Sequence, residues 1–161
     1  MVNLSVVKLP EMEEKEINGL LGEQMICRIA FKGDDYPYIS LFQYTMIEGF
    51  LYFHFTDYGN KIKLLKEDSR VCVEIEDHES DLSRYRFAVL RGELKVVEDP
   101  EERIKAIEKM AEEGKQKLST NFLAAHGFKK EEGWKALTPE KPLVIVKLHQ
   151  INAKIGLKSP E

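Results

Sequence analysis

The stretch from Leu51 to Ser69 holds the residue types with the clearest chemical potential in the chain. An apolar strand is predicted to run into His54, followed by a short polar turn containing Gly59 and a helix with Lys61 in its first turn. Free backbone N–H groups and the helix dipole favour an anion at a helix N-terminus, and a lysine there adds a positive charge. The pattern indicates a candidate phosphate site, although basic residues early in exposed helices are common on surfaces that bind nothing.

Length and composition describe an ordinary water-soluble protein. The 161 residues, with 43% hydrophobic and 32% charged content, fit a single domain spanning residues 1–161 with a substantial core. The net charge of −4 argues against non-specific nucleic-acid binding, which needs a basic surface. No apolar run approaches the ~20 residues of a membrane helix, so we expect no membrane partner. The N-terminal residues lack the apolar core of a signal peptide, which predicts a cytoplasmic location.

Strand-like segments joined by short turns dominate the chain. We expect strands over 24–31, 36–46, 50–55, 70–75, 86–97 and 143–151, and helices over 11–21, 59–66 and 101–117. Residues 118–142 are ambiguous, with a short helix around 121–126 and then a polar loop. Most strands are joined as hairpins, and neither strict βαβ alternation nor a Gly-x-Gly-x-x-Gly motif is present. The sequence therefore predicts a mainly β fold, a closed or nearly closed antiparallel barrel with peripheral helices.

Most aromatic and apolar side chains are expected in the core rather than in a site. The helix over 101–117 carries Ile104, Ile107 and Met110 at helical spacing, which is typical of a packing stripe. Cys27 and Cys72 lie in strand-like runs and are expected to be buried thiols. The four histidines are scattered, so we expect no metal site. The strand aromatics assigned mostly to the core are Tyr36, Tyr38, Phe42, Tyr44, Tyr52, Phe53 and Phe55.

The order of these segments resembles the flavin-binding split-barrel family, whose best-known member is pyridoxamine 5′-phosphate oxidase. Three pieces carry the resemblance: Asp-Asp-Tyr-Pro-Tyr-Ile over 34–39, the Tyr-Phe-His and Gly-Asn-Lys elements over 52–61, and Arg-Phe-Ala-Val-Leu-Arg-Gly-Glu over 86–93. The spacing His-x4-Gly-x-Lys, formed by His54, Gly59 and Lys61, is most similar to the nitroimidazole-reductase-like branch.

The resemblance implies a six-stranded antiparallel FMN-binding split barrel that forms a homodimer with the flavin at the subunit interface. Carried over from the family, Asn60 and Lys61 would hold the FMN phosphate, and His54 and Phe55 would lie beside the cofactor. The second strand would contribute Ser40, Leu41 and Phe42. Trp134 would be either a packing anchor for its own segment or a lid over the partner's flavin.

His54 is the catalytic candidate, because the histidine at this position lies in the active site of nitroimidazole-reductase-like relatives. An imidazole with a near-neutral pKa could pass a proton to a reduced substrate. The competing interpretation is a strand histidine whose nitrogens are satisfied by the neighbouring backbone.

The function implied by the resemblance is an FMN-dependent oxidoreductase acting on a small organic substrate. A nitroaromatic is one candidate substrate and NAD(P)H one candidate donor. A non-catalytic flavin carrier or sensor is the alternative, as is a haem- or deazaflavin-binding member of the same fold. The chain departs from pyridoxamine phosphate oxidase proper in three places: Phe87 replaces a flavin-binding glutamine, Ser40 replaces a phosphate-binding arginine, and the substrate-gripping C-terminal cluster is missing. Vitamin B6 oxidation is therefore not expected.

Overall fold

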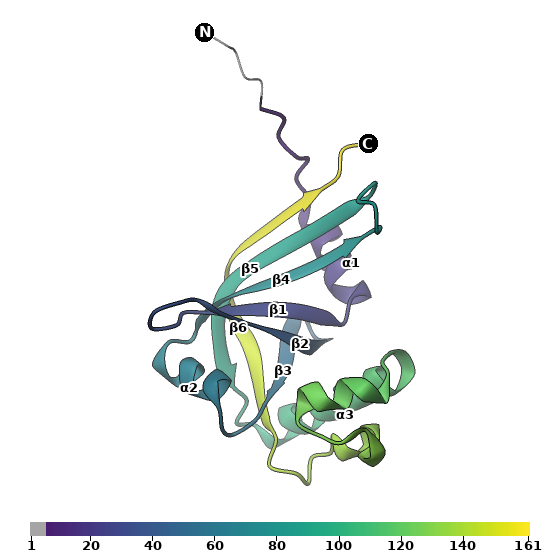
Figure 1. Ribbon diagram of the computed structural model, residues 1–161. Coiled ribbons are helices and arrows are strands. Elements are labelled where there is room, and N and C mark those ends of the chain that lie inside the picture. The colour runs from purple at the N-terminus through teal and green to yellow at the C-terminus, as the bar shows by residue number, and fades with distance from the viewer. Residues whose placement is uncertain (1–5) are drawn as a thin grey trace.

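The computed structural model describes residues 6–161, which form a closed six-stranded antiparallel barrel flanked by helices (Figure 1). The strands lie around the barrel in the order β1-β2-β3-β6-β5-β4, and β4 pairs with β1 to close it. This architecture confirms the fold class predicted from the sequence. The strands are β1 (Ile26–Phe31), β2 (Tyr38–Ile47), β3 (Phe50–Phe55), β4 (Arg70–His78), β5 (Tyr85–Val96) and β6 (Val144–Lys158).

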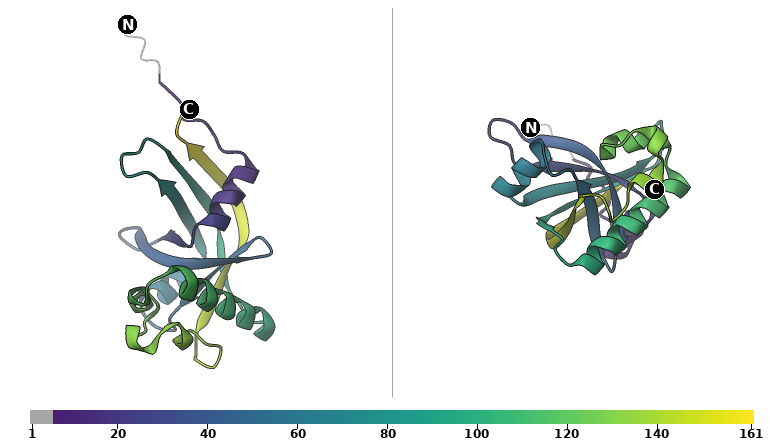
Figure 2. Two further views of the ribbon diagram at one scale, coloured as in Figure 1. Left: turned by 90° about the vertical axis from the view of Figure 1, so that its right-hand side faces the viewer. Right: turned by 90° about the horizontal axis from the view of Figure 1, so that it is seen from below.

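The helices cover the barrel at separate places. They are α1 (Glu14–Glu23), α2 (Asn60–Glu67) and α3 (Pro100–Lys117), followed by three 3-10 turns, η1 (Thr120–His126), η2 (Lys130–Glu132) and η3 (Trp134–Ala136). Figure 2 shows α3 and the η1–η3 segment together at the end of the barrel away from the C-terminus. None of the helices described within residues 6–161 is long and apolar enough to cross a membrane.

Local sequence signals explain where the elements begin and turn. The β2–β3 hairpin turns at Glu48 and Gly49, which both have positive φ angles, 52° and 85°. Two successive left-handed residues are what a tight hairpin requires, and glycine adopts this conformation without strain. Helix α3 begins where the Asp99 side chain accepts a hydrogen bond from the Glu102 N–H, with Pro100 as its first residue.

The apolar core has two parts. The first fills the barrel, where inward residues such as Phe31, Phe53 and Leu90 are at most 1% exposed. The second lies between α3 and the outer side of β3 and β6, and includes Tyr52, Ile107, Met110 and Ile145. This second layer matters for the site because it fixes α3 and the following turns against β2 and β3.

Several sequence expectations are corrected. β6 continues to Lys158, seven residues past the predicted end at 151. α1 starts only at Glu14, since Glu11 forms a β-bridge with Leu157, and Gly22 lies within the last turn of α1 rather than after it. Two residues assigned to the core are exposed: Tyr36 in the β1–β2 loop by 83% and Ile104 by 39%. Ile107 and Met110 are buried on one face of α3, and Ile104 lies outside that face.

The two cysteines differ in their surroundings. Cys27 points into the barrel, where burial raises the pKa of its thiol, whereas Cys72 is only half-buried. The expectation of two buried thiols therefore holds fully for Cys27 alone. Both cysteines are free thiols.

Candidate functional site

The N-terminus of α2 lies directly after β3, as the sequence predicts. The chain leaves β3 at Phe55 and turns at Gly59, whose φ of 92° is left-handed and whose side-chain-free backbone caps the helix without a side-chain hydrogen bond. Asn60 and Lys61 are the first two residues of α2, and Asn60 is exposed. The first-turn N–H groups therefore lack the side-chain cap that usually satisfies one of them.

Lys61 reaches back from α2 over the mouth of the barrel. Its Nζ lies 4.8 Å from the centroid of the Phe42 ring, which is a cation–π contact. Partial burial lowers the pKa of the lysine from its ordinary value. Among residues 6–161, no carboxylate lies within ion-pair distance of Nζ, whereas the exposed Lys63 on the same helix pairs with Glu67 at 3.9 Å. Lys61 is thus a half-buried cation without a countercharge.

His54 points out of the barrel from β3 and is nevertheless only 7% exposed. Two residues of the segment after α3 cover it. Nδ1 of His54 lies 3.2 Å from Nδ1 of His126, at the end of η1. The ring of Phe128 stacks on His54 with an interplanar angle of 3° and a centroid distance of 6.0 Å. Neither ring nitrogen of His54 bonds to the backbone of a neighbouring strand within residues 6–161. The interpretation of His54 as a strand histidine satisfied by neighbouring backbone therefore does not apply.

His126 continues the contact inward to β2 and α3. Its Nε2 lies 2.7 Å from Oε1 of Gln43, and Nε2 of Gln43 donates to the carbonyl oxygen of Met110 at 2.9 Å. Gln43 is 2% exposed and His126 is 6% exposed. Trp134 lies at the edge of His126, with ring centroids 5.9 Å apart. It is buried against Gly114, as expected for a packing anchor.

We call His54, His126, Gln43 and Phe128, together with the nearby Lys61, the His54 cluster. Its electrostatics favour neutral imidazoles. Burial, the neighbouring His126 and the charge of Lys61 together lower the pKa of His54 to about 3. Burial and the charge of Lys61 lower the pKa of His126 to about 4. Both directions follow from the cost of placing a proton on a buried ring beside a positive charge. At neutral pH the only charge in the cluster is therefore that of Lys61.

The residues carried over to β2 and β3 do not share one face. Side chains alternate along a strand, so Ser40 and Phe42 point into the barrel while Leu41 points outward and is 43% exposed. Phe55 is 1% exposed and stacks on Phe42 inside the barrel, with centroids 5.1 Å apart. The structure thus brings Lys61 close to Phe42 and His54, and it places Phe55 in the barrel interior. The Ser40 side chain also points inward but is only half-buried.

Sequence reasoning missed Gln43, His126 and Phe128. A signal for Gln43 was present, because an amide between Phe42 and Tyr44 in a strand of this kind becomes a buried polar group that needs partners. His126 lies 72 residues from His54 in a segment without helical or strand periodicity, so nothing in the local pattern connects them. Within residues 6–161, no three His, Cys, Asp or Glu side chains are grouped as metal ligands.

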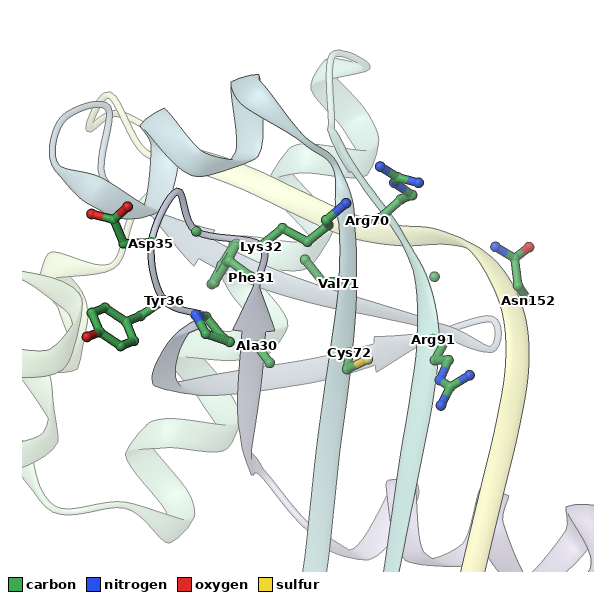
Figure 3. A pocket seen from close by; sticks show the side chains of 13 residues that line it. Ala30, Phe31, Lys32, Asp35, Tyr36, Arg70, Val71, Cys72, Arg91 and Asn152 are labelled. Atoms are coloured by element: carbon green, nitrogen blue, oxygen red, sulfur yellow. The ribbon is translucent and has the colours of Figure 1, made fainter.

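The barrel also carries a shallow cavity of about 530 Å³, whose lining includes neither His54 nor His126 (Figure 3). It is lined by β1, the β1–β2 loop and the strands β4, β5 and β6. Lys32, Arg70 and Arg91 are its basic residues. Lys32 and Arg70 both pair with Asp68, at 3.5 and 2.8 Å. Between the cavity and His54, the outward residues of β2 are Ile39 and Leu41, which are 63% and 43% exposed.

Solved structures with the same fold come from several bacteria. A FAD-binding protein from Mesorhizobium loti aligns over 96% of this chain and 98% of its own, with 18% identity and a TM-score of 0.69. A proposed 5-nitroimidazole antibiotic resistance protein from Bacteroides thetaiotaomicron aligns over 96% and 92%, with 17% identity and a TM-score of 0.65. A FAD and heme binding protein from Mycobacterium smegmatis aligns over 92% and 72%, with 14% identity and a TM-score of 0.65. At these identities the likeness shows the fold alone.

Sequence comparison gives the family. No curated protein matches the chain. The family model described as pyridoxamine 5′-phosphate oxidase matches residues 13–140, which is well over half of the chain and extends from α1 to the end of the η3 segment. The matched range includes β3, α2 and the whole of the His54 cluster. The chain therefore belongs to the pyridoxamine 5′-phosphate oxidase family.

Proposed function

We propose that the protein binds FMN and uses it to oxidise or reduce a small organic substrate. The observation that carries the proposal is Lys61, a half-buried ammonium group at an uncapped helix N-terminus without a carboxylate partner in residues 6–161. A buried cation without a countercharge is unfavourable, and a phosphate would satisfy both the ammonium group and the first-turn N–H groups. One cationic side chain at this helix start suits a single phosphate, which is our reason for proposing FMN rather than FAD.

The surroundings of Lys61 also fit a flavin ring. Leu41 offers exposed apolar surface on the outer face of β2, and His54 and Phe128 form a stacked aromatic pair beside it. Apolar and aromatic walls with a few polar groups are typical of cofactor sites. A bound flavin would supply the electron-transfer chemistry, while these residues would bind and orient it. The solved structures of FAD-binding proteins with this fold support the flavin class.

We further propose that two copies of the chain associate through the outer barrel face. Ile39 and Leu41 on β2 and Ile155 on β6 are exposed apolar side chains, by 63%, 43% and 44%, and contiguous apolar surface is typical of an interface. The strand register connects Leu41 to Ile155 through Arg28 on β1, Glu74 on β4 and Val89 on β5. A second copy on this face would cover the apolar side chains and provide a second wall for a flavin beside Leu41. We retain the cytoplasm, where NAD(P)H is available, as the proposed compartment.

The first experiment establishes the cofactor and the reaction class. We expect the purified protein to carry, or to take up, a flavin that is released as FMN on denaturation and identified by chromatography. NAD(P)H should bleach its absorption, and a nitroaromatic or another small oxidant should restore it. A bound flavin that no donor reduces would favour the carrier or sensor. Uptake of haem or a deazaflavin in place of FMN would refute the cofactor assignment.

The second experiment tests the phosphate seat. Replacing Lys61 with alanine should weaken FMN binding by about 1.5–3 kcal/mol, the scale of one charge-assisted hydrogen bond, or about tenfold or more in Kd. Lys63→Ala is the matched control, because Lys63 lies on the same helix but is exposed and paired with Glu67. Fluorescence quenching on titration of the apo variants gives both affinities. Equal FMN affinities of the Lys61→Ala and Lys63→Ala variants would refute the assignment of Lys61 to the FMN phosphate.

A further inference from the structure

Three hydrogen bonds connect His54 to the backbone of α3 through His126 and Gln43. The distances are 3.2 Å between the two histidine Nδ1 atoms, 2.7 Å from His126 Nε2 to Gln43 Oε1, and 2.9 Å from Gln43 Nε2 to Met110 O. All three side chains are at least nine-tenths buried. Buried polar groups of this kind are held in fixed geometry by their partners, so the direction of each bond is defined.

The donor and acceptor of each of these three hydrogen bonds follow from the group at the end of the series, the carbonyl oxygen of Met110. The carbonyl oxygen of Met110 can only accept, so the amide nitrogen of Gln43 must face it and the amide oxygen of Gln43 must face His126. That oxygen also only accepts, so Nε2 of His126 carries a proton. A neutral imidazole has one N–H, and Nδ1 of His126 is therefore an acceptor. The hydrogen between the two rings must then belong to Nδ1 of His54.

The alternative direction needs a protonated His126, which its surroundings disfavour. An imidazolium at His126 could donate to both Gln43 and His54, and would reverse the direction of the hydrogen bond between the two histidines. Burial and the nearby Lys61 charge both oppose such a cation. The other groups packed on the ring, Phe122 and Trp134, carry no charge that would stabilise it. With both rings neutral, only one arrangement satisfies every donor and acceptor.

The free end of this arrangement is Nε2 of His54. Among residues 6–161, Nε2 of His54 has no hydrogen-bond partner. The atom is still in contact with solvent, unlike the sealed unpartnered atoms Glu74 Oε1 and Trp134 Nε1. We propose that Gln43 and His126 act as positioning residues that hold His54 as the neutral Nδ1–H tautomer, so that its Nε2 lone pair accepts a hydrogen bond from an N–H or O–H of the bound flavin. The ligand part of this assignment rests on the proposed function. The tautomer does not.

This assignment changes the role expected for His54 from the sequence. A resting Nε2 without a proton cannot deliver one, so the side chain acts as an oriented acceptor beside Lys61. The ammonium group and the imidazole would then present one donor and one acceptor to the same ligand. FMN offers matching groups, because its phosphate accepts and its ring and ribityl chain carry N–H and O–H donors.

Long-range ¹H–¹⁵N NMR of histidine-labelled apo protein at neutral pH tests the tautomers directly. We expect opposite patterns for the two touching rings: His54 with a protonated Nδ1 and a bare Nε2, and His126 with a bare Nδ1 and a protonated Nε2. His54→Gln and His126→Gln assign the signals. His149 is an internal reference, because its Nδ1 faces the carbonyl oxygen of Glu93 at 3.0 Å and must donate there. A protonated Nε2 on neutral His54 would overturn the proposal.

Substitution of Gln43 separates positioning from packing. Gln43→Glu removes the amide that donates to Met110 O and places a carboxylate beside His126, which favours an imidazolium there, so His126 should show two protonated nitrogens. Gln43→Leu removes the acceptor, and both rings should then show mixed protonation. If Gln43→Leu does not fold, the wild-type and Gln43→Glu spectra still decide. Unchanged tautomers in a folded Gln43→Leu protein would show that the chain of hydrogen bonds does not set them.

Titration with FMN tests the ligand contact in the same spectra. We expect FMN to move the His54 Nε2 signal and to leave that of His149 in place. FMN that binds by fluorescence quenching without moving Nε2 would overturn the contact alone. Failure of FMN to bind would refute the contact together with the proposed function, while the apo spectra would still decide the tautomer.

Discussion

Acidification should destabilise this protein through His54 and His126 before the carboxylates with lowered pKa values begin to titrate. In the unfolded chain both histidines have a pKa of about 6.5. In the folded protein, burial holds the two pKa values at about 3 and about 4. Between these limits the unfolded state binds more protons than the folded state, so the stabilisation is complete above about pH 7 and is lost as the pH falls.

The magnitude follows from the proton count. On going from about pH 7.5 to about pH 5, each buried histidine should lower the free energy of unfolding by about 2 kcal/mol, or about 4 kcal/mol for the pair. This is a large share of the 5–15 kcal/mol typical of a folded domain, taken as an order of magnitude. The carboxylates with lowered pKa values, such as Asp68, Asp77 and Glu102, titrate below this range and do not contribute to it.

Urea unfolding at several pH values measures the effect. Trp134 is the only tryptophan in the chain and lies beside His126, so its fluorescence reports on the site, and far-UV circular dichroism reports on the barrel. In the double variant His54→Gln/His126→Gln the loss of stability between about pH 7.5 and about pH 5 should largely disappear. The control is His78→Gln/His149→Gln, whose rings contact backbone carbonyls in more open positions. An equal pH dependence in the two double variants would refute the reasoning.

Two further perturbations probe the packing of the covering segment and the outer face. A Cβ on Gly114 would lie 2.3 Å from Cζ3 of Trp134, so Gly114→Ala should cost about 1–3 kcal/mol in urea unfolding and expose the tryptophan. Gly19→Ala in α1, where a Cβ meets nothing within 4 Å, should be neutral or stabilising, and equal effects would contradict the clash. Leu41→Glu should convert a dimer to a monomer in light scattering, whereas Ile104→Glu, at a similar exposure on α3, should leave the molar mass unchanged. A monomeric wild-type protein at micromolar concentration would refute the dimer itself.

The barrel could be predicted because its signals are local. Alternation of apolar side chains and turn residues such as Glu48 and Gly49 identified all six strands. The extension of β6 had the same signal, since Ile151, Ala153, Ile155 and Leu157 recur at every second position. Asn152 and Lys154 give the segment a polar character that favours an early end, although Lys154 pairs with Leu90 on β5 and its ammonium group lies 3.4 Å from Glu14 of α1.

The candidate site could be predicted only in part. Lys61 and His54 lie within eight residues of each other, and the strand-turn-helix pattern was sufficient to place them together. The contact of His54 with His126 depends instead on how the η1–η3 segment packs against α3 and β2. The buried side chain of Trp134, which lies against Gly114 of α3, determines that packing. No periodicity in residues 118–142 encodes that packing. Tertiary contacts of irregular segments leave no trace in a single sequence unless a buried polar residue, here Gln43, points to them.

The position of β6 has a consequence for biosynthesis. This last strand pairs with both β3 and β5, and its end is hydrogen-bonded to Pro10 and Met12 near the start of the described chain. While residues 144–158 are still in the ribosome, the nascent sheet has two open edges, and such edges readily pair with other chains. Folding of the barrel can therefore be completed only after residues 144–158 have left the ribosome. A chain cut short before Val144 would leave an aggregation-prone open sheet rather than a closed barrel.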